Sequence, residues 1–139
     1  MKLRRAIVIS VVTYLTTFVI GAAVSFLISH PVSVDQPPSA NAVLATMLAA
    51  IVAGGFGAWW YLRPAEIPGG AKAGFLFGLV ATVTAFILDG LLALGLLVSG
   101  RDPMPLLRDS YTHWFFGIMM VVGLVVTTLV GTSKVRHGY

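Results

Sequence analysis

The chain has 139 residues, of which 58% are hydrophobic and only 10% are charged. Soluble domains carry about 25% charged residues, so this composition excludes a water-soluble globular protein. The net charge is +4, but the basic residues lie at the ends of long apolar stretches, which indicates membrane topology instead of nucleic-acid binding.

Four apolar stretches follow one another along the chain, each with the roughly 20 residues that a helix needs to cross a bilayer. They are residues 6–28, 42–62, 73–98 and 113–131. The first follows a basic start and is longer than the apolar part of a signal peptide, so we expect it to be retained as a membrane helix.

The segments between these stretches are rich in proline, glycine and polar residues, which predicts loops. They are residues 29–41, 63–72 and 99–112, and a basic tail follows at 132–139. Seven of the nine Lys and Arg residues lie at the termini or in the middle loop, and the other two, Arg101 and Arg108, lie in the third loop. Because positive charge is retained in the cytoplasm, we expect both termini there and the first and third loops outside.

The predicted fold class is therefore an all-α integral membrane protein. We expect a four-transmembrane-helix antiparallel bundle with N-in/C-in topology, in a bacterial-type cytoplasmic (inner) membrane. Small residues recur at four-residue spacing in every stretch, and such stripes let helix backbones approach closely in lipid. Close packing is expected at five glycines: Gly21, Gly54, Gly57, Gly78 and Gly123.

Asp89 is the only ionisable residue in the longest stretch. A carboxylate inside a bilayer costs about 2.5–3.5 kcal/mol on insertion scales, so it should face protein instead of lipid. Counting inward from the outer helix ends places hydroxyls of the first stretch at a similar depth. We therefore expect Asp89 to hydrogen-bond Tyr14 or Thr17.

Two interpretations of Asp89 are open. Acids inside membranes often mark proton or cation pathways, which favours a proton or cation site formed with Tyr14 and Thr17. A hydrogen bond that holds two helices together is the simpler alternative.

His30, Asp109 and His113 all fall on the expected outer side, where they would make a metal set of two histidines and one carboxylate. Interfacial polarity and helix capping explain these residues more simply. The chain contains no cysteine, no HExxH sequence and no catalytic Ser/His/Asp order. We therefore expect no cofactor and no nucleic-acid partner.

From these observations we expect a small non-enzymatic subunit with an assembly, accessory or structural role that depends on helix–helix packing. Its expected partners are membrane lipids and either further copies of itself, as a homo-oligomer, or a larger membrane complex. The first alternative is an oligomeric proton- or cation-coupled transporter or channel that uses Asp89. The second alternative is an enzyme that modifies lipid at the outer face through His30 and His113.

Overall fold

The structure, a computed structural model, describes residues 2–28, 40–104 and 114–137. Within these residues the chain forms helices and no strand. The helices are α1 (Leu3–Ile28), α2 (Ala40–Leu62), α3 (Ala71–Val98) and α5 (Trp114–His137). The prediction of an all-helical chain is confirmed for this part of it, and α5 continues past residue 131 into the basic tail.

Three of the helices contain stretches that are long and apolar enough to cross a membrane. These stretches are Leu3–Gly21, Ala71–Val98 and Gly117–Val135. The residues described in α2 include a shorter apolar stretch, Met47–Leu62. Length and composition thus favour a multi-pass membrane protein.

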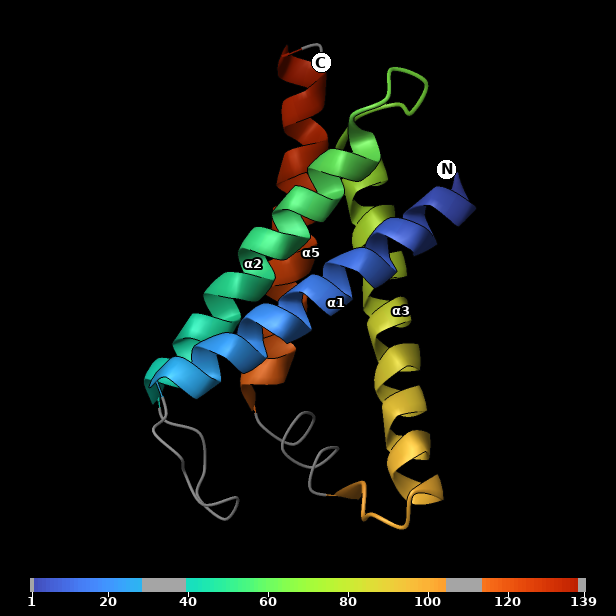
Figure 1. Cartoon of the computed structure of the whole chain (residues 1–139). Helices are drawn as coiled ribbons and strands as arrows, with labels where there is room; N and C mark the ends of the chain where they lie inside the picture. The colour runs from blue at the N-terminus through green and yellow to red at the C-terminus, as the bar shows by residue number, and fades with distance from the viewer. Residues whose placement is uncertain (1, 29–39, 105–113, 138–139) are drawn as a thin grey trace.

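Both ends of the chain lie at the same end of the bundle as the loop between α2 and α3 (Figure 1). We call this the terminal end; it comprises residues 2–10, 58–77 and 130–137. α3 packs along α5 and α1 packs along α2, while α2 also contacts α5 and α1 also contacts α3. α1 and α3 separate toward the opposite end (Figure 1), so the bundle is tight at one end and open at the other.

The buried core gathers at the terminal end. Seven hydrophobic residues pack together there: Ala6, Ile9, Ala58, Tyr61, Leu62, Ile67 and Phe77. The Tyr61 ring stacks on Phe77, with centroids 5.0 Å apart and planes 17° from parallel. Because lipid tails are as apolar as these side chains, the core stabilises the bundle through close van der Waals contact.

Gly74 and Gly131 bring the backbones of α3 and α5 into contact. A Cβ atom added at Gly131 would lie 2.9 Å from the backbone nitrogen of Gly74, and one added at Gly74 would lie 2.9 Å from the carbonyl carbon of Thr127. The backbone N–H of Gly70 also donates to the carbonyl of Gly131 at 2.7 Å. Only residues without a Cβ atom allow the two helices to approach this closely.

Lys134 ties α5 to the loop that follows α2. Its ammonium group donates to the backbone carbonyls of Leu62, Pro64 and Ile67, at 2.9 Å for Pro64 and 2.6 Å for Ile67. The carbonyls in the last turn of a helix lack partners within the helix, so Lys134 also caps the C-terminus of α2.

Three of the five glycines expected at close contacts lie in packed positions. A Cβ atom added at Gly57 would collide with the hydroxyl of Thr13 on α1, and one added at Gly78 would collide with the hydroxyl of Thr127 on α5. Gly21 is buried.

For Gly54 and Gly123 the described part of a single chain shows no close contact, so close packing there stays a prediction. A Cβ atom added at either position would meet no atom within 4 Å among the described residues. Four-residue spacing shows which face of a helix carries small side chains. The rotation and crossing angle of the helices decide which of these faces packs against a neighbouring helix.

We predict that Gly131→Ala lowers the free energy of unfolding by about 1–3 kcal/mol, because the new Cβ atom must overlap the backbone of α3. Gly117→Ala is the matched control on the same helix, since an added Cβ atom there meets no described atom within 4 Å. Alanine is better than glycine inside a helix by roughly 0.5–1 kcal/mol, so the control should be neutral or stabilising. Thermal unfolding in mild detergent measures both, and equal stability of the two variants would contradict the close contact.

Candidate functional site

Asp89 lies in the second half of α3, and its carboxylate accepts a hydrogen bond from the Tyr14 hydroxyl on α1. Both residues are half-buried. Tyr14 is one of the two partners expected from the depth of Asp89 in its helix. The bond ties α1 to α3 across the bundle.

The Thr17 hydroxyl, the other expected partner, instead donates to the carbonyl of Thr13 in its own helix, at 2.9 Å. The hydroxyls of Ser10 and Thr82 do the same, donating to Ala6 at 2.8 Å and to Gly78 at 3.0 Å. A hydroxyl that has donated its proton to the backbone still offers its oxygen as an acceptor. These three hydroxyls therefore present acceptors to whatever lies beside them.

Asp89 and these hydroxyls line one pocket of about 240 Å³. The lining comes from all four helices, and it divides into a polar and an apolar half. The hydroxyl-bearing residues are Ser10, Thr13, Tyr14, Thr17 and Thr82. The apolar residues are Ala50, Ala81, Ala85, Phe86, Met119 and Met120.

Asp89 is the one charged residue in the described lining of this pocket. The pocket can therefore accept hydrogen bonds and attract positive charge. A carboxylate among hydroxyl groups can hold a cationic or hydrogen-bonding ligand.

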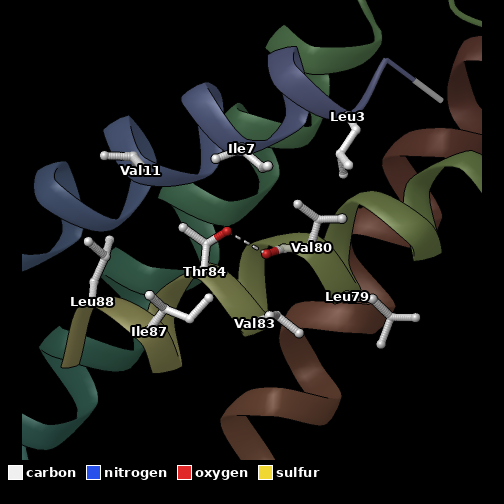
Figure 2. Close-up of a pocket in the computed structure, with 9 residues that line it drawn as sticks. All are labelled: Leu3, Ile7, Val11, Leu79, Val80, Val83, Thr84, Ile87 and Leu88. Atoms are coloured by element: carbon white, nitrogen blue, oxygen red, sulfur yellow. Dashed lines mark hydrogen bonds between the residues drawn. The ribbon is translucent and has the colours of Figure 1, made fainter. Parts of the chain in front are cut away.

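A second pocket, of about 380 Å³, lies between α1 and α3 toward the terminal end (Figure 2). Leu3, Ile7 and Val11 of α1 face leucine, isoleucine and valine side chains of α3 across it. Its one polar side chain, Thr84, donates its hydroxyl to the carbonyl of Val80 at 2.7 Å. Such a pocket can hold hydrocarbon, but its described lining has no charged group to orient a ligand, so the Asp89 pocket is the better candidate.

Lys2 pairs with Glu66 of the α2–α3 loop at the terminal end. The hydrogen bond and the charge of Lys2 hold the pKa of Glu66 below its usual value, and the charge of Arg5 adds to this effect. Both side chains are exposed, and exposed pairs contribute little to stability. The pair therefore links the N-terminus to the loop without forming a binding site.

The predicted metal set of His30, Asp109 and His113 lies outside the described residues, so it stays a prediction. Among the residues that the structure does describe, no three His, Cys, Asp or Glu side chains group closely enough to hold a metal ion.

Sequence reasoning missed Ser10 as a member of the pocket. It lies four residues before Tyr14, and residues four apart share one face of a helix, so this spacing was the available signal. No spacing in the sequence predicted that Met119 of α5 lines the pocket, because its position depends on how α5 is rotated against α3.

Comparison with models of protein families, with curated proteins and with solved structures finds no match to this chain.

We predict that Tyr14→Phe lowers the free energy of unfolding by about 0.6–1.7 kcal/mol, which runs from the average to the largest value found for hydrogen bonds between membrane helices. Thr16→Val is the control on the same helix, because Thr16 is exposed and its hydroxyl donates to the carbonyl of Val12 at 2.8 Å. Combining Tyr14→Phe with Asp89→Leu isolates the bond in a double-mutant cycle measured by unfolding in mild detergent. Fully additive losses would show that the two side chains do not interact.

Proposed function

We propose that this chain is a small four-span membrane protein that acts as a non-enzymatic packing subunit, assembling with further copies of itself. The observation that carries this proposal is the presence of glycines in α3 that no described residue contacts. Gly90 and Gly95 are exposed, and a Cβ atom added at either would meet no described atom within 4 Å.

Glycine inside a helix is less favourable than alanine by roughly 0.5–1 kcal/mol. Packing within the described chain does not explain Gly90 and Gly95, and contact with lipid does not require them. Exposed glycine on a membrane helix is typical of a position where the backbone of a second helix approaches. Asp89 still contacts Tyr14 of α1, but beyond it α3 diverges from α1 (Figure 1), and both glycines are exposed to a partner.

A second copy of the chain suits this face because the face is self-complementary. At 100° per residue, Gly90 and Gly95 flank a ridge formed by Leu91, Leu94 and Val98. These three side chains are all exposed. The ridge side chains of one copy can pack against Gly90 and Gly95 of the other copy. In a twofold dimer the same surface lies on both sides of the interface.

The charge distribution supports a cytoplasmic-membrane location with both termini in the cytoplasm. Of the nine Lys and Arg residues, those at the terminal end are Lys2, Arg4, Arg5, Arg63, Lys72, Lys134 and Arg136. Basic residues beside membrane helices remain on the cytoplasmic side, so this end is proposed to face the cytoplasm.

We predict that the combined substitution Gly90→Leu and Gly95→Leu weakens self-association about tenfold or more while the monomer still folds, because the new side chains fill the space at these two glycines but meet nothing within the chain. Ala23→Leu, at an exposed position on α1, is the matched control. Size-exclusion chromatography with light scattering in mild detergent, and crosslinking in membranes, measure the association. A wild-type chain that is monomeric in membranes, or a variant that associates like the control, would refute the proposal.

Single cysteines test the topology, since the chain contains no native cysteine. Ala65→Cys in the α2–α3 loop and Ser99→Cys after α3 are both at exposed positions. We predict that a membrane-impermeant maleimide labels Ser99→Cys in intact cells, and labels Ala65→Cys only after the membrane is permeabilised. The reverse pattern would invert the proposed orientation.

A further inference from the structure

We propose that the Asp89 pocket is a binding site for one small primary ammonium ion. The first argument is charge. Asp89 is the only charged residue in the described lining of the pocket, so the lining favours a ligand with a single positive charge. Charges interact more strongly inside a protein than in water, because the surroundings screen them less.

The hydrogen-bonding character of the lining is the second argument. The Tyr14 hydroxyl donates its proton to Asp89. The hydroxyls of Ser10, Thr17 and Thr82 donate theirs to backbone carbonyls. Toward a ligand, this part of the lining therefore offers acceptors.

An ammonium group complements such a lining, because it carries three N–H donors and no acceptor. A carboxylate or phosphate ligand, which brings only acceptors, would face other acceptors and the charge of Asp89. A neutral amide would leave its own carbonyl oxygen without a donor from these groups. Asp89 and the hydroxyls of Ser10, Thr17 and Thr82 thus favour a ligand that only donates.

Size and the apolar half of the lining distinguish an organic ammonium ion from a metal ion. Pockets for drug-sized ligands begin at about 300 Å³, and this pocket measures about 240 Å³. Ala81, Ala85, Met119 and Met120 offer methyl and thioether surface that suits a short alkyl chain. An alkali ion would instead need oxygen ligands on the side that these residues occupy.

The site does not depend on the proposed packing role. Asp89 points toward α1, while Leu94 and Val98 of the ridge lie on the opposite side of α3 by helical geometry. Failure of self-association would therefore leave the proposed binding site standing, and failure of binding would leave the packing role standing.

Binding can be measured on the purified full chain in mild detergent, with n-propylammonium chloride as the probe. We expect a saturable heat of binding in calorimetry and a rise in Tm. Sodium chloride at equal ionic strength should give neither, and tetramethylammonium, which has no N–H group, should give neither. A sodium response equal to that of propylammonium would overturn the proposed ligand class, and the absence of a saturable response would overturn the site.

Variants locate the binding within the chain. Asp89→Asn removes the charge but keeps the shape, and should weaken propylammonium binding about tenfold or more, as expected for a lost charge-assisted hydrogen bond. Thr17→Val should weaken it by a smaller factor, about threefold, whereas Thr16→Val on the outside of the same helix should leave it unchanged. If Asp89→Asn does not fold, the comparison of Thr17→Val with Thr16→Val decides. Equal binding by these two threonine variants would overturn the assignment to this pocket.

Discussion

The backbone contact between Gly74 on α3 and Gly131 on α5 constrains the rest of the bundle. With no Cβ atom between them, the two helices meet main chain to main chain, and the Gly70 N–H donates to the Gly131 carbonyl. Lys134, one turn further along α5, then donates to the carbonyl of Leu62 at the end of α2 and to two carbonyls of the loop that connects α2 to α3. Three helices are thereby joined at the terminal end, and the buried core lies at that same end.

A bundle joined at one end can open at the other, and α1 and α3 do separate there (Figure 1). The Tyr14–Asp89 hydrogen bond links these two helices beside the polar pocket. The outward side of α3 carries the exposed Gly90 and Gly95. One helix thus carries a polar pocket on one side and two exposed glycines on another, so the proposed ligand binding and the proposed self-association need not compete for the same surface.

Much of this architecture follows from local sequence. The long apolar runs predict the helices, and prolines and glycines between them predict where the helices end. The inward direction of Asp89 also follows from sequence, because a carboxylate facing lipid is costly and a small-residue stripe runs through its position. Its bond to an α1 hydroxyl could be anticipated because Tyr14 lies at a similar depth and the other helices offer no hydroxyl there.

The sequence by itself therefore determined the helical class, the apolar spans and the polar contact between α1 and α3. Only the tertiary structure decided which glycines touch a neighbour: Gly57 and Gly78 do, whereas Gly54 and Gly123 do not within the described chain. It also decided that Lys134 hydrogen-bonds the α2–α3 loop, and that Met119 lines the pocket. The physical reason is that such contacts depend on the rotation and crossing angle of each helix, which arise from the packing of all four together and are not encoded in the periodicity of any one.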